Sequence, residues 1–128
     1  MDKRIVNTNN APDPVGPYSQ AVIAGQFVFC SGQIAINPST GEIVNNDIEA
    51  ETAQVMDNLK AVLEAASSSF GSVVKTTIFV KNMGDFGRIN KIYGNYFEGN
   101  PPARATIEVS ALPKGANVEI ECIALRED

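Results

Sequence analysis

The segment from residue 46 to residue 69 most constrains the fold, because its apolar side chains recur at the i, i+3, i+4 spacing of a long amphipathic helix. Asn46 and Glu49 occupy the positions of a capping box and predict where this helix begins. A helix with one apolar stripe must bury that stripe against another layer of structure.

Strand patterns lie on both sides of this helix. The segment at residues 72–81 is rich in β-branched and aromatic residues and predicts a strand. A short strand is also predicted at residues 2–7, and two strands at about 104–110 and 117–126 end the chain. Two further extended runs flank Ala24-Gly25 and predict a hairpin whose second strand contains Phe27 to Cys30. The stretches at residues 10–20 and 37–42, which contain proline and glycine, are predicted to be loops.

A second helix is predicted after Asp85, which stands at its N-cap. The sequence Gly99-Asn100-Pro101 ends this helix, and its inner stripe consists of Phe86, Ile89, Tyr93, Tyr96 and Phe97. The order of elements predicts one α+β domain over residues 1–128, a mixed sheet with both helices packed on one face.

The opposite face of this sheet has no predicted cover. In the last strand, alternation places Glu119 and Glu121 on the same side as Ile123 and Leu125. In the preceding strand, side chains alternate in the same way: Arg104, Thr106 and Glu108 lie on one side, and Ala105, Ile107 and Val109 lie on the other. A half-apolar sheet face exposed to water is typical of an interface. We therefore expect an oligomer in which sheets meet and charged residues lie near the contact.

The charge balance and the absence of histidine limit the possible chemistry. Ten basic and fifteen acidic residues give a net charge of −5 with no run of like charge, unlike a binder of nucleic acid backbones. Because the chain has no His, it lacks the commonest general base and metal ligand and has no Ser/His or Cys/His pair.

The cysteines and the hydropathy pattern concern the compartment. Cys30 and Cys122 lie within apolar strand patterns and are predicted to be buried thiols rather than parts of a disulfide framework. The sequence shows no signal peptide pattern and no apolar run of about 18 residues. The chain is therefore expected to be soluble and cytoplasmic.

Arg104 and Glu119 are the charged candidates for a functional site. The planar fork of Arg104 matches a carboxylate, although a strand-end salt bridge to Glu119 or Glu121 is the structural alternative. Glu119, if partly buried near a cation, could act as a general acid or base, whereas carboxylates on a last strand are more often solvated.

Three polar residues are further candidates. Tyr18 follows Gly-Pro in the first loop and could bind a ligand or pack, and Ser31 lies at a strand end beside Gly32, where a backbone can approach a ligand closely. Bonding of the Ser31 hydroxyl to backbone is the alternative for that residue. Asn90 lies beside the apolar stripe of the second helix, where a polar side chain most often faces solvent.

Five segments together resemble the Rid/YjgF family, in particular its reactive intermediate deaminase A group. They are GPYSQA at 16–21, SGQI at 31–34, NLKAVLEAA at 58–66, VKTTIFV at 74–80, and PARATIEVSALP followed by VEIE at 102–121. The resemblance covers nearly the whole chain in order. It implies a chorismate mutase-like fold that forms a homotrimer, with a central β-barrel and ligand pockets between the subunits.

The activity implied by the resemblance is hydrolysis of 2-imino acids and their enamine tautomers to 2-keto acids and ammonia. The substrates include 2-aminoacrylate, 2-iminopropanoate and 2-iminobutanoate, which pyridoxal phosphate-dependent serine and threonine dehydratases release. The resemblance implies no cofactor and no metal. Neither a membrane nor a nucleic acid is an expected partner.

The resemblance also assigns roles by position. Arg104 corresponds to the family arginine that holds the substrate carboxylate, and Glu119 to the glutamate that positions the attacking water. Tyr18, Ser31 and Asn90 match pocket positions. The backbone of Thr106 would help to hold the carboxylate; many relatives have cysteine there, and a thiol role cannot apply to this chain.

Two alternative functions remain open on the sequence. One is an endoribonuclease or translation inhibitor, a label that members of this family have carried, although the acidic charge balance disfavours RNA binding. The other is a non-enzymatic or chaperone-like protein that binds keto acids in the same pocket. Both binding and catalysis need Arg104, whereas a pure sensor has no evident need for Glu119.

Overall fold

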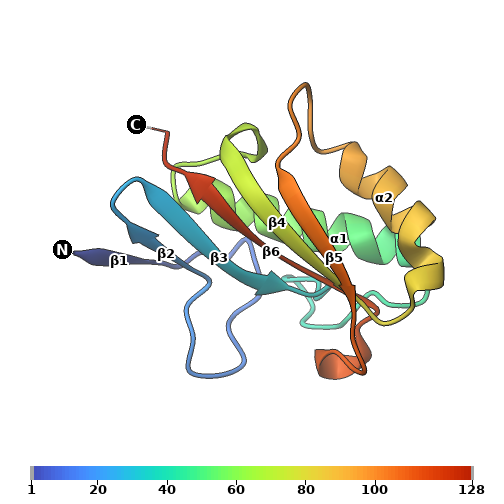
Figure 1. Cartoon of the computed structure of the whole chain (residues 1–128). Coiled ribbons are helices and arrows are strands. Elements are labelled where there is room, and N and C mark those ends of the chain that lie inside the picture. The colour runs from blue at the N-terminus through green and yellow to red at the C-terminus, as the bar shows by residue number, and fades with distance from the viewer. Residues whose placement is uncertain (1, 128) are drawn as a thin grey trace.

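The protein is a six-stranded mixed sheet with two α-helices on one face (Figure 1), as described for residues 2–127 by a computed structural model. The sheet order is β1-β2-β3-β6-β4-β5, and β4 and β5 are parallel whereas the other pairs are antiparallel. The elements are β1 Lys3–Val6, β2 Ala21–Ala24, β3 Phe27–Gln33, α1 Ile48–Ala65, β4 Val73–Val80, α2 Phe86–Gly94, β5 Ala103–Glu108 and β6 Val118–Leu125.

This arrangement confirms the predicted α+β class and the packing of both helices on one face of the sheet. The hairpin at Ala24-Gly25 also forms, with Ala24 opposite Phe27 and Gly25 at a φ of 61°. Glycine is suited to that turn because a side chain makes positive φ unfavourable. Strand β3 continues beyond the predicted Cys30 to Gln33, through an irregularity in its pairing with β6.

The start of α1 differs from the prediction by one residue. The N-cap is Asp47, whose carboxylate accepts hydrogen bonds from the backbone N–H groups of Glu49 and Ala50. The proposed capping box at Asn46 is therefore wrong. Both residues are good N-caps, and the chain places the carboxylate, which also complements the positive end of the helix, at the capping position.

Helix α2 is shorter than predicted and is capped differently. It ends at Gly94, so that Tyr96 and Phe97 pack against the core from beyond the helix. Asp85 makes no capping hydrogen bond and instead accepts a 2.8 Å hydrogen bond from Arg88. The side chain of Asn82 caps the short 3₁₀ turn before the helix by accepting from the N–H of Gly84.

The core lies between α1 and the central strands. Helix α1 contacts β6 and β3, and its buried stripe includes Val55, Met56, Leu59, Val62 and Leu63. Alternation along β6 directs toward this stripe the buried side chains of Val118, Ile120, Cys122 and Ala124. Cys30 and Cys122 are paired across β3 and β6 as buried free thiols, as predicted.

The face of the sheet opposite the helices carries large exposed apolar side chains. Phe27 and Phe29 of β3 are 46% and 45% exposed, Ile107 of β5 is 45% exposed, and Leu125 of β6 is 37% exposed. Glu119 and Glu121 belong to the same face because they alternate with the buried residues of β6. The prediction of a half-apolar, uncovered face is therefore confirmed for a single protomer.

The observed cap makes a stability prediction. Replacement Asp47→Ala removes both capping acceptors and should lower the free energy of unfolding by about 1 kcal/mol. Asn46→Ala, one residue earlier, should change it by no more than a few tenths. Urea denaturation followed by circular dichroism measures both values, and equal losses would contradict the assignment of Asp47 as the cap.

Candidate functional site

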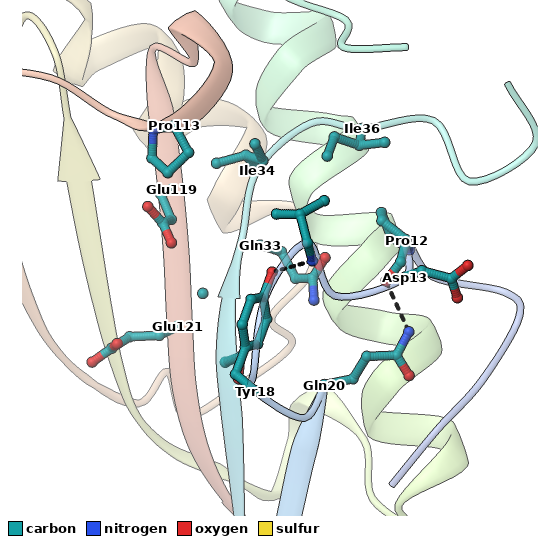
Figure 2. A pocket seen from close by; sticks show the side chains of 13 residues that line it. Pro12, Asp13, Tyr18, Gln20, Gln33, Ile34, Ile36, Pro113, Glu119 and Glu121 are labelled. Carbon is teal, nitrogen blue, oxygen red and sulfur yellow. Dashed lines mark hydrogen bonds between the residues drawn. The ribbon is translucent and has the colours of Figure 1, made fainter. Parts of the chain in front are cut away.

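A cavity of about 410 Å³ lies between the first loop, the end of β3 and the start of β6. Figure 2 shows Glu119 and Glu121 projecting from β6 on one side of this cavity and Tyr18 on the other. We call it the Glu119 cavity. Its lining consists of Pro12, Asp13, Val15, Tyr18, Gln20, Ser31, Gly32, Gln33, Ile34, Ile36, Pro113, Glu119 and Glu121.

The carboxylate of Glu119 lies directly over Gly32 of β3. A Cβ atom on Gly32 would overlap this carboxylate, with the Glu119 Cδ only 3.0 Å away. Glycine at this position therefore leaves the space that the carboxylate occupies. The group that approaches Gly32 is thus a side chain of the same protein, and the predicted approach of a ligand to this backbone stays a prediction.

Burial gives Glu119 an unusual protonation equilibrium. Its pKa is raised above the ordinary value for glutamate, first by desolvation in the half-buried cavity and second by the negative charge of Glu121. A carboxyl group whose pKa is shifted toward neutrality can accept and return a proton under the same conditions. Glu119 is thus equipped for acid–base work, whereas Glu121 is exposed.

Hydrogen bonds hold the first loop over the cavity. The Tyr18 hydroxyl accepts a 3.3 Å hydrogen bond from the N–H of Val15, which closes the loop on itself (Figure 2). The Ser31 hydroxyl donates to the backbone carbonyl of Ser19 at 2.6 Å. Tyr18 and Ser31 both line the cavity, and the alternative of a backbone-bonded Ser31 hydroxyl holds. A role in ligand binding stays a prediction for both residues.

Two buried amides that the sequence analysis did not select also shape this cavity. Gln20 is 1% exposed and accepts from the N–H of Thr8 while donating to carbonyls of the loop, including that of Pro12 at 2.9 Å. Asn58 of α1 is 1% exposed and donates to the carbonyls of Ile34 and Ile36 at 3.1 and 2.9 Å. The available signal for Asn58 was a polar residue next to Leu59 on the buried side of the helix, where its amide needs hydrogen-bond partners.

Arg104 lies on the other face of the sheet from Glu119. Its β4 partner is Thr76, whose β6 partner is the buried Cys122, and residues paired across a sheet share a face. Glu119 is three residues from Cys122 and so faces the opposite way. From the strand spacing and the rise per residue, the Cα atoms of Arg104 and Glu119 are about 14 Å apart.

The guanidinium of Arg104 is held by α2. Its Nη1 donates to the Oδ1 of Asn90 at 2.6 Å, and its Cζ lies 5.3 Å from the ring centroid of Phe86 and 5.1 Å from that of Tyr93. Asn90 is exposed and also bonds Arg104, so facing solvent describes only part of its role. The structural alternative of a salt bridge from Arg104 to Glu119 or Glu121 is wrong within the protomer, because the sheet separates them.

A second cavity, of about 500 Å³, lies beside this arginine. We call it the Arg104 cavity, and it is lined by Asn90, Tyr93, Gly94, Pro101, Pro102 and Arg104. Thr106 is two residues along the same row of β5, the last strand of the sheet. The backbone N–H of Val109 donates to the carbonyl of Val80 on β4. Backbone N–H groups alternate between the two sides of a strand, so the N–H of Thr106, three residues earlier, points away from β4 toward the open edge of the sheet.

The predicted site residues therefore form two groups in one protomer. Glu119, Ser31 and Tyr18 line the Glu119 cavity, whereas Arg104 and Asn90 line the Arg104 cavity. Residues 2–127 contain no group of three or more Cys, Asp or Glu side chains placed to hold a metal ion. Within the same range, no helix is long and apolar enough to cross a bilayer.

Comparison with known proteins identifies the family. A sequence model described as Endoribonuclease L-PSP matches residues 8–126, nearly the whole chain. The chain belongs to the YjgF/Rid family. A RutC family protein from Pyrococcus horikoshii is 52% identical over 98% of this chain and 99% of its own length. The mouse 2-iminobutanoate/2-iminopropanoate deaminase is 44% identical over 97% of this chain and 92% of its own length.

The fold is shared with solved members of the YjgF/Rid family. The YjgF gene product of E. coli, whose crystal structure is known, superposes with a TM-score of 0.92 at 44% identity. The match covers 97% of this chain and 99% of the E. coli chain. The six-stranded sheet and two helices are therefore family features.

The carboxylate pair makes a prediction about proton binding. Replacement Glu121→Gln removes a negative charge near Glu119 and should lower the pKa of Glu119, without returning it fully to the ordinary value because burial remains. Titration of the ¹³C side-chain carboxyl resonances by NMR measures the shift. Glu42→Gln, at an exposed residue that does not line the Glu119 cavity, should leave the titration of Glu119 unchanged.

The raised pKa also sets the sign of a pH effect on stability. Glu119 binds its proton more tightly in the folded state than in the unfolded state. Its contribution to the stability of the folded state is therefore fully present below the pKa of the unfolded state and is lost as the pH rises through the pKa of the folded state. Glu119→Gln should therefore be more stable than the parent near pH 7, and this advantage should disappear near pH 4. An unchanged difference across that range would contradict the shift.

Proposed function

We propose that this protein is a 2-iminobutanoate/2-iminopropanoate deaminase, which hydrolyses 2-imino acids and enamines such as 2-aminoacrylate to 2-keto acids and ammonia. The observation that carries this proposal is the half-buried carboxyl of Glu119, whose pKa is raised, beside an open cavity. The mouse relative that bears the name of this activity is 44% identical over nearly the whole chain.

Arg104 is assigned to hold the substrate carboxylate. Its guanidinium uses Nη1 for Asn90, which leaves further N–H donors for a two-pronged contact with a carboxylate. Thr106 is two residues from Arg104 on the same strand, and its backbone N–H, which points to the open edge of the sheet, can donate a further hydrogen bond to the carboxylate. A substrate held in this way has its imine carbon at a fixed distance from the Arg104 guanidinium and in one orientation.

Glu119 is assigned to the proton transfers. The carbon of a protonated imine is already electrophilic, so attack requires a positioned water molecule and a base more than a covalent nucleophile. Glu119 accepts a proton from the water as its oxygen bonds to the imine carbon, which gives a tetrahedral amino alcohol. Glu119 then returns that proton to nitrogen, which makes ammonia the leaving group. As the C–N bond breaks, the hydroxyl oxygen forms the C=O bond of the 2-keto acid and gives its proton to the Glu119 carboxylate. The released ammonia takes up that proton, and Glu119 is again ionised.

A second copy of the chain is needed to unite the two groups of residues. Arg104 and Glu119 lie on opposite faces of one sheet, about 14 Å apart, which is too far for both to contact a substrate of three or four carbons. The exposed apolar side chains on the face that bears Glu119 favour contact with another subunit. We propose a homotrimer in which the Glu119 cavity of one subunit meets the Arg104 cavity of the next.

The arginine assignment predicts a loss of activity without a loss of assembly. Arg104→Ala should lower kcat/KM at least about a hundredfold, because the substrate carboxylate loses its charged partner. The oligomeric state, measured by light scattering, should be unchanged because Arg104 bonds within its own protomer. Arg104→Lys should remain strongly impaired, since an ammonium cannot form the two-pronged contact.

The assembly proposal predicts a separate effect on the sheet face. Phe29→Asp places a charge among exposed apolar side chains and should shift the mass measured by light scattering from trimer toward monomer. Lys60→Asp, on the exposed side of α1, is the matched control and should leave the mass unchanged. A trimer that survives Phe29→Asp would contradict the use of this face.

The deciding assay couples this protein to a serine dehydratase that releases 2-aminoacrylate in the presence of semicarbazide. Suppression of the trapped adduct by the parent protein and not by Arg104→Ala supports the deaminase. If neither protein suppresses the adduct, tight binding of a 2-keto acid would indicate a sensor. Cleavage of RNA that is lost in the same variant would indicate the endoribonuclease named by the family description.

A further inference from the structure

The guanidinium of Arg104 lies across one face of α2 on a regular set of three side chains. Phe86, Asn90 and Tyr93 are spaced i, i+4 and i+7, so all three project from the same side of the helix. The two rings lie 5.3 and 5.1 Å from the Arg104 Cζ, and the Asn90 Oδ1 between them accepts from Nη1 at 2.6 Å. We call this set the guanidinium cradle.

The cradle is itself fixed from below. Tyr93 is 5% exposed, and its hydroxyl shares a 2.8 Å hydrogen bond with the Oγ1 of Thr76, which is 2% exposed. Its ring also packs against Phe97 at a centroid distance of 4.8 Å. Burial raises the pKa of Tyr93, so this phenol stays neutral at physiological pH. The platform under Arg104 therefore has one preferred orientation.

Contacts with the guanidinium cradle reduce the conformational entropy that Arg104 would lose when it binds a carboxylate. Arg104 is an exposed residue on an edge strand, and a free arginine side chain has several rotatable bonds whose freedom is lost when it binds a ligand. Contacts with the two rings limit the orientation of the guanidinium plane, and one of its N–H groups donates to Asn90. The remaining N–H groups stay available in a fixed direction.

We propose that Phe86 and Tyr93 are positioning residues of the carboxylate site, which hold the Arg104 guanidinium ready to bind the carboxylate of a 2-imino or 2-keto acid. This inference rests on the proposed role of Arg104. It assigns a function to two residues that the helical pattern identifies only as apolar stripe. A guanidinium suits this arrangement because its planar faces can lie against the rings while N–H donors on its edge remain free for a carboxylate.

The test compares ring removal with ring retention. Phe86→Leu removes one ring contact and should raise KM about three- to tenfold while kcat changes less than about twofold, because a grip used equally in ground and transition states affects KM. The dissociation constant for 2-oxobutanoate, measured by calorimetry, should rise by the same factor. Phe86→Tyr keeps an aromatic ring and should restore both values to near those of the parent.

The matched control is Phe70→Leu, which removes a ring that contacts Tyr96 and Phe97. The rings beside the Arg104 guanidinium are those of Phe86 and Tyr93, so Phe70→Leu should lose thermal stability without a change in KM. Tyr93→Phe retains the ring but loses the bond to Thr76 and should show a smaller increase in KM than Phe86→Leu. Equal effects of Phe86→Leu and Phe70→Leu on KM would overturn the proposal.

A readout without catalysis separates this inference from the deaminase proposal. The ¹⁵N{¹H} NOE of the Arg104 Nε–H should be high in the parent and Phe86→Tyr and low in Phe86→Leu, whether or not any substrate is turned over. If the parent protein has no deaminase activity but the NOE pattern holds, the cradle stands and the reaction assignment fails. An NOE as high in Phe86→Leu as in the parent would refute the cradle.

Discussion

The alternation of side chains along β6 is the constraint on which the rest of the structure depends. This strand pairs with both β3 and β4 and lies at the centre of the sheet. Its even-numbered residues from Val118 to Ala124 are buried under the helices, and this leaves Glu119 and Glu121 on the other face. The alternation of side chains along this one strand therefore determines both the packing of the core and the position of Glu119.

The same alternation separates the two charged groups that the proposed reaction requires. Arg104 shares a row with Thr76 and Cys122 on the helix side, whereas Glu119 faces the open side. One protomer therefore presents these residues in two separate cavities. Assembly through the apolar sheet face would both remove that face from water and complete the site, so stability and activity would depend on the same contact.

Buried polar side chains give the two cavities their shape. Gln20 holds the first loop, Asn58 holds the backbone that follows β3, and Thr76 holds the Tyr93 ring beneath Arg104. Glu51 of α1 is fully buried and accepts from both the backbone and side-chain nitrogens of Asn117, just before β6 begins. Gln20, Asn58 and Glu51 satisfy hydrogen bonds of loop backbone inside the protein, and Thr76 satisfies the buried hydroxyl of Tyr93.

The sequence by itself determined the element types, the α+β class and the uncovered sheet face, because periods of 3.6 and 2 and turn residues are local signals. The candidate site residues were named by the resemblance to a family, and their roles stay predictions. The sequence did not determine that Asp47 rather than Asn46 caps α1, or that α2 ends at Gly94, since competing local choices differ little in energy. Only the tertiary structure decided that Arg104 and Glu119 lie on opposite faces and that Phe86 and Tyr93 hold the arginine. Those relations depend on which strands become neighbours, and strand order arises from packing of the whole chain.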